Sequence, residues 1–508
     1  MKKKSASFLS VLLVCSLLLT SVSCSEKEAS AEESKTDTQS TGDISEVIES
    51  TEADEKTEER IQPDIPMEAD FGGDEIRFIH WAGWEGTVRY CRDICVEGLT
   101  GEIINDTVYN RNLDIESRYN VKLAVDIIDL NQVNNEVSKQ VQAGDDTYDV
   151  VFPILLFMHS LSNQGYLVNL HEVPNMDLTK PWWDQNSVES ITYSNYLPAV
   201  SSSLSVNDKD GTAAMAFNKT LASNYGLPDI YELVREGKWT FDKLSELAAS
   251  ASQDIDGDGI ITEADLYGML GGNDVSYSFY FASGERMITN NEEGKFVLAF
   301  GGERSFDVMY SINNLMHQSW FFNHHEASNA DDGYYQKLFE TGHGTFFWMR
   351  LDAVTDMRNG EADFGVIPNP KYTEEQNTYC SIVSPYTCGI MSLPITLTGE
   401  KLDEVGMILE AMAAYSHYTL IPAYIDTSLK TKHARDEESA EMMDIILSNR
   451  IFDPMMFYNF GSMRDSLLGW GAKDNLNLAS IYRSGKKVTE RTIKNFEEEL
   501  AQALADNQ

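Results

Sequence analysis

Basic residues are scarce in this chain. Its 508 residues contain 39 Lys and Arg against 81 Asp and Glu, which gives a formal net charge of −42 at pH 7. Nucleic-acid binding needs clustered Lys and Arg that neutralise phosphates, and adsorption to anionic lipid needs the same side chains. We therefore expect no nucleic-acid partner and no direct attachment to an anionic membrane surface.

Cysteines are few, and two of the six fall in the first 24 residues. The remaining four permit two disulfides in an exported protein. Cys380 and Cys388 flank a turn-prone Ser-Pro pair inside apolar, β-branched sequence, so we predict that they form a disulfide across a hairpin. Cys91 and Cys95 either pair locally or remain unpaired; no second His or Cys pair lies near them at zinc-ligand spacing.

Long apolar runs are also lacking, except near the N-terminus. Three lysines precede an uncharged apolar run at residues 8–19, which ends in small residues before Cys24. This order is typical of a secretory signal, and the run is short for a membrane span. We expect residues 1–23 to be a signal peptide and Cys24 to be lipidated, which would anchor the exported protein to the outer face of the cell membrane. The alternative is an ordinary signal peptide, because Ser21 stands where lipoproteins usually carry Leu.

The segment that follows is poor in large apolar residues. Residues 25–62 contain 13 acidic and 4 basic residues. Such a composition buries too little surface to offset the entropy lost on ordering, and its charges repel one another. We expect residues 24–62 to be a disordered acidic tether that begins with the lipidated cysteine.

Signatures of catalysis are missing as well. The sequence has no Gly-rich phosphate loop, no Gly-x-Ser-x-Gly elbow and no His-Glu-x-x-His helix, and its nine His are scattered. We therefore expect a protein that is not an enzyme.

What the chain does contain is an alternation of apolar strands and amphipathic helices. Strands are expected at residues 75–81, 121–127 and 148–152, and helices at residues 105–119 and 131–143. This alternation predicts an α/β layer structure with parallel strands. Further strands are expected at residues 213–218, 345–349, 364–368 and 389–393, and further helices at residues 241–252, 402–414 and 437–508, the last with a break at 452–461.

One local motif stands out. Residues 254–265 read Asp-Ile-Asp-Gly-Asp-Gly-Ile-Ile-Thr-Glu-Ala-Asp, with carboxylates at positions 1, 3, 5 and 12 and Gly at position 6. This is the pattern of an EF-hand-type calcium loop, although Asp replaces the usual Glu at position 12. A polar turn between two helices is the alternative. The predicted ligands of a structural calcium ion are Asp254, Asp256, Asp258, Ile260, Thr262 and Asp265.

The surroundings of this motif resemble a known family. The pieces that carry the likeness are Ala-Ala-Met-Ala-Phe-Asn-Lys at 213–219, Tyr-Gly-Leu-Pro-Asp at 225–229, Gly-Lys-Trp-Thr-Phe-Asp at 237–242 and Gly-His-Gly-Thr-Phe-Phe-Trp at 342–348. In their order they resemble the extracellular solute-binding proteins (family 1 type) of carbohydrate-uptake ABC transporters.

The resemblance implies a fold class and a division of the chain. It implies an α/β, two-lobed periplasmic-binding-protein-like fold of type II, each lobe a sheet flanked by helices, with hinge crossings. The first lobe would comprise residues 74–193 and 380–416, and the second residues 194–372, which include the calcium-type loop, and 417–508. The protein would be a monomer that delivers a small solute, with sugar or oligosaccharide expected, to a transmembrane ABC permease.

Sugar sites pair stacking aromatic rings with planar hydrogen-bonding groups. Trp348 is the first candidate, because it lies where this family commonly places a stacking aromatic. The other candidate ligand-binding residues are Arg350, Asp352, Trp81, Trp84, Glu85, Trp182, Trp183 and Trp470. An apolar stretch at residues 153–158 stands where sugar-binding relatives often carry polar groups, and it would instead suit a peptide or a lipid-like solute.

Two other functions remain open at this point. A secreted glycan-cleaving enzyme with a calcium brace needs only two suitably spaced carboxylates, and acidic residues are abundant here. An adhesin stiffened by calcium is the third possibility. The three differ in whether a bound glycan is returned intact and whether solutes induce closure.

Overall fold

The computed structural model describes residues 60–66, 68–83, 92–326, 333–357, 360–429 and 437–506. The residues from Ile61 onward form one compact unit. The predicted signal peptide, Cys24, the tether up to residue 59, Trp84, Glu85 and Cys91 lie outside the described residues. No helix in the described ranges combines the length and the apolar character needed to cross a membrane.

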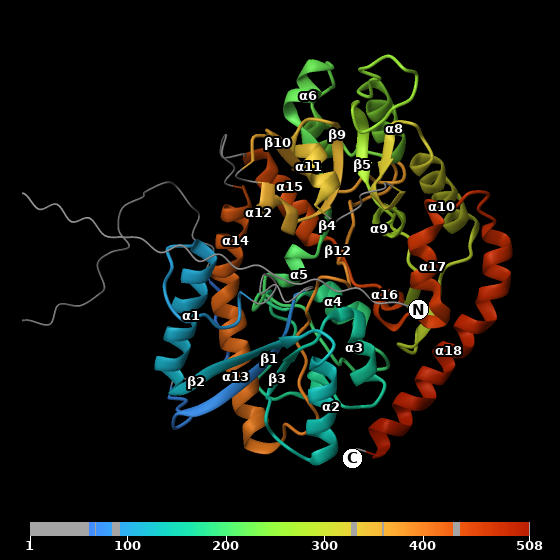
Figure 1. Cartoon of the computed structure of the whole chain (residues 1–508). Helices are drawn as coiled ribbons and strands as arrows, with labels where there is room; N and C mark the ends of the chain where they lie inside the picture. The colour runs from blue at the N-terminus through green and yellow to red at the C-terminus, as the bar shows by residue number, and fades with distance from the viewer. Residues whose placement is uncertain are drawn as a thin grey trace, which may run out of the picture. The chain divides into compact units, whose positions relative to one another are not determined.

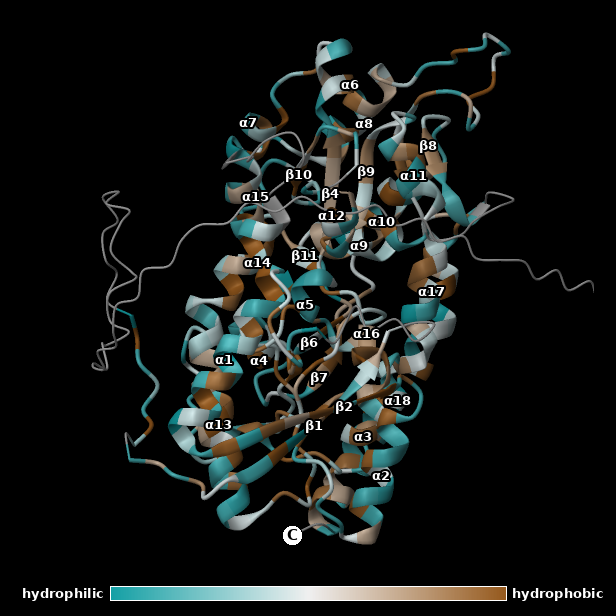
Figure 2. Cartoon of the chain, turned by 60° about the vertical axis from the view of Figure 1, so that its left-hand side comes forward, coloured by the Kyte–Doolittle hydropathy of each residue, from teal (hydrophilic) through white to brown (hydrophobic). Residues whose placement is uncertain are grey.

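The first sheet is parallel. Its strands are β1 (Asp74–Ala82), β2 (Val121–Asp129) and β3 (Val150–Phe152), in the order β2-β1-β3. Helices α1 (Ile103–Tyr119) and α2 (Val133–Ala143) make the crossovers and contact this sheet. Apolar residues run along β1, as Figure 2 shows.

A later segment returns to this sheet. Backbone bridges join Val151 to Ser392, Ile154 to Gly389 and Val200 to Met391. The helix that follows, α13 (Gly399–Tyr418), contacts α1. Residues from two distant parts of the chain therefore build the first lobe.

The second sheet has the order β10-β4-β9-β5-β8. Pairs of β4 with β9 and β10 are antiparallel, whereas β5 pairs in parallel with β9 and β8, so this sheet is mixed and not parallel as expected. The bounds are β4 (Ala213–Asn218), β5 (Tyr267–Gly271), β8 (Phe321–Asn323), β9 (Gly344–Arg350) and β10 (Phe364–Ile367).

Helices cover both faces of the second sheet. One core contains residues of α8 (Phe241–Ser250) and α10 (Glu303–Met316) with Phe346 and Trp348 of β9. The other contains residues of α11 (Tyr334–Glu340), α12 (Asp352–Met357) and α15 (Glu437–Ser448) with Phe347 and Met349. The two-lobed arrangement, each lobe a sheet flanked by helices, is therefore present (Figure 1).

Short elements connect the lobes. They are α5 (Asn207–Asp210), β11 (Ser381–Ile382) and β12 (Arg450–Ile451), and α5 lies between the two sheets in Figure 1. Strands β11 and β12 pair in parallel, and Thr212 bridges to Val383. The chain thus passes between the lobes at three places that lie side by side.

The C-terminal segment departs from the expected division. Helix α16 (Pro454–Tyr458) packs on α3 (Leu155–Ser162) of the first lobe, where the hydroxyls of Tyr458 and Ser162 are 3.0 Å apart. Helix α18 (Leu478–Asp506) has 29 residues, about 44 Å at the α-helical rise, and its Phe496 ring lies 5.1 Å from Tyr193. Nearer its start, the Tyr482 ring lies 5.8 Å from Phe306 of the second lobe, so residues 417–508 contact both lobes and do not belong to the second lobe alone.

The predicted disulfide between Cys380 and Cys388 is wrong. Both are free thiols, 8% and 0% exposed. The chain around Pro385 is not a hairpin, because β11 pairs with β12 while the stretch from Gly389 pairs with the first sheet. The two flanks therefore diverge. Cys95 is also a free thiol.

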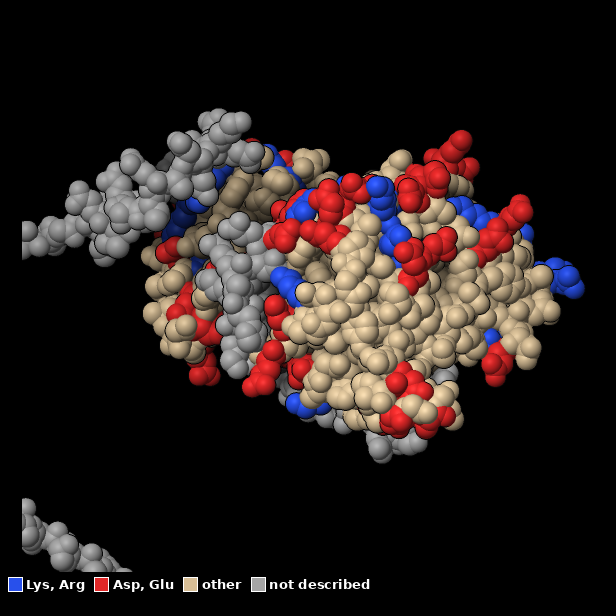
Figure 3. Space-filling model, turned by 90° about the horizontal axis from the view of Figure 1, so that it is seen from above, with Lys and Arg blue, Asp and Glu red and all other residues tan. Residues whose placement is uncertain are grey.

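The acidic composition is visible on the surface. Figure 3 shows Asp and Glu side chains outnumbering Lys and Arg on the face seen from above. Several of the acids have basic neighbours, such as Glu438 and Glu441, which pair with Arg235 at 3.0 Å and 2.9 Å.

Candidate functional site

A cavity of about 650 Å³ lies on the second lobe. It is bounded by the end of β9, by α12, by the start of α9 (Asp274–Ala282) and by η4 (His324–Glu326). Ser384, Tyr386 and Thr387 close another side. The turn that carries them also contacts the first lobe, where the Leu156 N–H donates to the Pro385 carbonyl (3.0 Å). The cavity therefore lies where the second sheet approaches the first lobe.

Strand alternation decides which residues of β9 reach this cavity. Phe347 and Met349 line it, whereas Trp348 points to the opposite face of the sheet and packs in the other core. Successive side chains within a strand point to opposite faces, so Trp348 does not share a face with Phe347 and Met349. Arg350 is the last residue of β9 and reaches the cavity from the end of the strand. Trp348, the first choice for a stacking residue, is therefore a core residue of the second lobe and is not among the residues that line the cavity.

Two other predicted residues do line it. Arg350, at the end of β9, and Asp352, at the start of α12, both face the cavity, with Arg350 Nη2 3.3 Å from Asp352 Oδ2. Asp352 is nearly buried, whereas the Arg350 side chain is 27% exposed. The guanidinium is therefore oriented by the carboxylate while part of it stays accessible.

The aromatic lining of the cavity was not predicted. It consists of Tyr335 on α11, Phe347 on β9 and Tyr386 in the turn. Tyr335 stacks on the His324 ring at 4.2 Å with an interplanar angle of 4°. Burial raises the pKa of Tyr386 although Arg464 opposes the shift, so this phenol stays neutral and can both donate and accept hydrogen bonds. No sequence motif marks Tyr335 or Tyr386; they are single aromatics that the fold brings together.

The other predicted tryptophans that lie within the described residues are packing residues. Trp81 and Trp182 are 0% exposed, Trp183 is 1% exposed and Trp470 is 3% exposed. The Trp183 indole donates to Glu410 Oε2 (2.9 Å), and the Trp470 ring lies 5.1 Å from Phe300. None of them lines the 650 Å³ cavity, although Trp182 borders a second cavity of about 360 Å³ near Lys209 and Arg450.

The apolar stretch at residues 153–158 is not a pocket wall either. It forms the start of α3, where Leu155, Leu156 and Met158 are buried against the first sheet. None of these residues lines the 650 Å³ cavity. The apolar stretch therefore gives no support to a peptide or lipid-like solute in that cavity.

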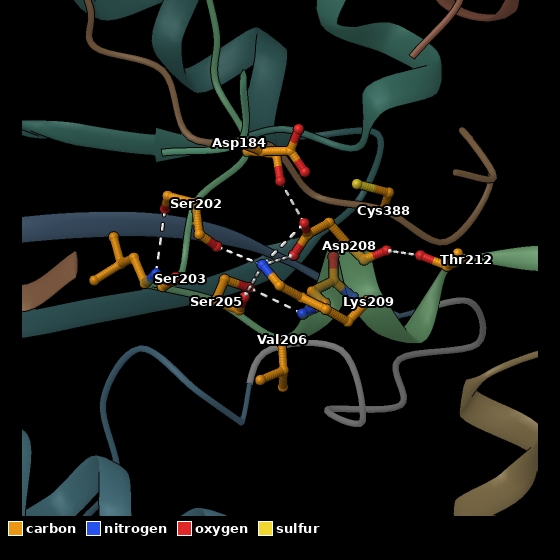
Figure 4. Close-up of polar contacts among 12 residues, drawn as sticks. Asp184, Ser202, Ser203, Ser205, Val206, Asp208, Lys209, Thr212 and Cys388 are labelled. Atoms are coloured by element: carbon orange, nitrogen blue, oxygen red, sulfur yellow. Dashed lines mark hydrogen bonds and ion pairs between the residues drawn. The ribbon is translucent and has the colours of Figure 1, made fainter. Parts of the chain in front are cut away.

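A second group of charged residues surrounds α5. We call it the α5 network, and its members are Asp184, Asp208, Lys209 and Arg450. Lys209 Nζ lies 2.9 Å from Asp208 Oδ1 and donates to the carbonyls of Ser202 (2.5 Å) and Ser205 (3.0 Å), as Figure 4 shows. Arg450 of β12 forms ion pairs with both Asp208 and Asp184. Burial alone would raise the pKa of Asp208, but Lys209 and Arg450 outweigh it and lower that pKa. Two acids and two bases thus compensate one another where the connecting segments meet.

The predicted calcium loop lies between α8 and β5, so it joins a helix to a strand. Carboxylate oxygens of Asp254, Asp256 and Asp265 lie within 4.8 Å of one another. Backbone N–H groups of Thr262 and Ile255 donate to Asp265 at 2.8 Å each and lower its pKa. The group is composed of oxygen donors, which fits a hard divalent cation.

Solved structures resemble this chain. No protein-family model and no curated protein matches the sequence. An ABC substrate-binding protein from Listeria monocytogenes in complex with cycloalternan has 11% identity and a TM-score of 0.51, over 84% of this chain and 99% of that chain. UspC of M. tuberculosis has 13% identity and a TM-score of 0.54, over 82% and 99%. The sugar-binding protein MalE from Xanthomonas citri has 12% identity and a TM-score of 0.53, over 84% and 98%. The chain therefore has the two-lobed α/β fold of these ABC solute-binding proteins.

Proposed function

We propose that this protein captures an extracellular sugar or oligosaccharide and delivers it to an ABC importer permease, without catalysing a reaction. The observation that carries the proposal is the cavity beside the connecting segments. It combines aromatic rings, of which Tyr386 is only partly buried, with the accessible guanidinium of Arg350, the pairing that sugar recognition uses. The fold likeness adds support, because the neighbours are described as sugar-binding or substrate-binding proteins.

A thermal-shift screen of the full chain against a glycan library and a peptide library tests this function. A ligand that binds only the folded state raises the melting temperature. We expect glycans to raise it and peptides to leave it unchanged. Stabilisation by peptides alone would contradict the sugar assignment.

The fate of the bound glycan distinguishes a binder from the glycan-cleaving alternative. After incubation with each stabilising glycan, we expect its full length to be recovered. Shorter products would show hydrolysis and would overturn the proposal of a non-enzymatic binder. Closure on the solute, measured by small-angle scattering, would further separate a hinged binder from an adhesin.

The same proposal includes anchoring through lipid on Cys24. Metabolic labelling with a fatty acid should label the wild-type chain in the membrane fraction. Cys24→Ser should abolish both labelling and membrane association, whereas retention of the label would contradict this assignment.

We also propose that calcium braces the loop at residues 254–265. Asp254, Asp256 and Asp265 would hold the ion, and its charge would offset the repulsion among their carboxylates. The loop borders β5 and lies apart from the residues that line the 650 Å³ cavity, so the role proposed is structural.

A further inference from the structure

Three metal-ligating side chains converge at one side of the cavity. Asp274, His324 and His325 each offer a donor atom, and these atoms lie within 4.8 Å of one another. Asp274 begins α9, while the two histidines follow β8 directly. We propose that they bind a divalent transition-metal cation of the zinc class.

The His324 ring is held in place before any metal binds. It is 4% exposed and lies between two rings: Tyr335 at 4.2 Å and His325 at 3.9 Å. A ligand whose orientation is fixed by packing loses little entropy on coordination. The site is therefore preorganised at its buried ligand.

The tautomer of His325 also suits coordination. The Asn273 backbone N–H donates to His325 Nδ1 (3.1 Å), so this nitrogen carries a lone pair and no proton. The Asn323 side-chain amide donates to Asn273 Oδ1 (3.1 Å) and links the two segments that carry the ligands. Nδ1 can exchange a long hydrogen bond for a metal bond without losing a proton.

Gly272 allows the two imidazoles to approach. A Cβ at this position would stand 2.4 Å from His324 Nε2 and 2.8 Å from His325 Nδ1. A side chain there would occupy the space next to both nitrogens. Glycine therefore leaves room between the two donor nitrogens.

The donor set selects the class of cation. Two imidazoles and one carboxylate suit zinc, iron(II) and nickel, whereas calcium and magnesium prefer oxygen ligands alone. Three protein ligands leave at least one coordination position, and here it would face the cavity that Asp274, His324 and His325 line. A sugar hydroxyl pair could complete the coordination, but metal binding itself does not depend on the proposed sugar function.

Titration of the full chain with Zn²⁺, without any solute, tests the site. The chain is first stripped with a chelator and then saturated with Ca²⁺, so that the oxygen-only loop does not compete. We expect one Zn²⁺ per chain by calorimetry. Co²⁺ in place of Zn²⁺ should give visible d–d absorption that reports nitrogen coordination.

Variants distinguish this site from other histidines. His325 is exposed, so His325→Gln should fold normally and weaken Zn²⁺ binding by about 100-fold, as Asp274→Asn should by about 10-fold or more. The matched control is His317→Gln, which removes a surface histidine 3.3 Å from Asp474 and should leave binding unchanged. The proposal would be overturned if the wild type did not bind stoichiometric Zn²⁺. It would also be overturned if His325→Gln and Asp274→Asn bound Zn²⁺ as tightly as the wild type. Zn²⁺ binding without any glycan binding would refute only the sugar function.

Discussion

The cavity and the α5 network both gather Asp with Arg or Lys, yet their surroundings differ. In the network, Asp208, Lys209 and Arg450 are each no more than 6% exposed and satisfy one another. In the cavity, the Arg350 side chain keeps 27% of its surface exposed beside a nearly buried Asp352. Charges that are fully compensated hold segments together, whereas a charge that is left accessible can bind something else.

Breaking the network should have the largest effect on stability. Arg450→Met leaves Asp208 and Asp184 buried without their shared partner, and removing one member of a buried pair costs about 3–5 kcal/mol. Urea denaturation should show this loss in the free energy of unfolding. The matched control is Arg235→Met, whose partners are about half exposed, and its loss of stability should be much smaller because water already screens these pairs. Equal losses in both variants would contradict the distinction drawn between the two kinds of ion pair.

A buried carboxylate that accepts hydrogen bonds from backbone N–H groups sharpens the comparison. Burial raises the pKa of Asp453 to about 6, against the hydrogen bonds from Met455 and Met287 and the charge of Arg286. Because this pKa lies above the unfolded value near 4, its contribution to stability is fully present below pH 4 and is lost as the pH rises through 6. Two pKa units correspond to about 2–3 kcal/mol.

Asp453→Asn should remove this part of the pH dependence. Urea denaturation of both proteins between pH 4 and pH 7.5 measures it as the difference between the two curves. A constant difference across this range would show that Asp453 does not titrate as stated.

Substitutions of residues that line the cavity should change the affinity for the ligand more than the free energy of unfolding. Tyr386→Ala should weaken affinity for a stabilising glycan about 10-fold or more, because it removes a stacking surface and a hydroxyl. Trp348→Phe should leave affinity within about 2-fold, since Trp348 belongs to the core on the opposite face of β9. Isothermal titration calorimetry of the two variants checks both, and the reverse order would restore Trp348 as the stacking residue.

The smallest effect is expected at the calcium loop. Saturating Ca²⁺ should raise the melting temperature of the wild type by a few degrees and that of Asp256→Asn by less, because one of the three clustered carboxylates is lost. Mg²⁺ at the same concentration serves as the control, since it fits a larger and flexible oxygen site poorly. Identical shifts of the melting temperature in the wild type and the variant would show that Ca²⁺ does not bind at this loop.

Several elements followed directly from local sequence. Strand β4 begins and ends where its apolar run predicted, and Thr240 caps α8 by accepting a hydrogen bond from the Lys243 N–H (3.3 Å). Gly144 ends α2 in the left-handed conformation, with φ of 67°. These features depend on neighbours in the chain, so periodicity and capping residues suffice to predict them.

The residues that line the cavity could not be predicted from local sequence in the same way. Arg350 and Asp352 were predicted because they lie next to Trp348 in the sequence, and both line the cavity. Trp348 was misplaced because the sequence shows that alternate residues of β9 share a face but not which face meets the cavity. Tyr386 was missed because the turn that carries it reaches the cavity only through pairing of its two flanks with different partners.

The sequence by itself determined the acidic character, the order of strands and helices and the pattern of the calcium loop, since each depends on composition or on residues a few positions apart. The tertiary structure alone decided that Cys380 and Cys388 stay apart, that Asp208 meets Arg450, and that Asp274 meets His324 and His325. Contacts between residues this far apart in sequence depend on how helices and sheets pack, and no local pattern encodes that packing.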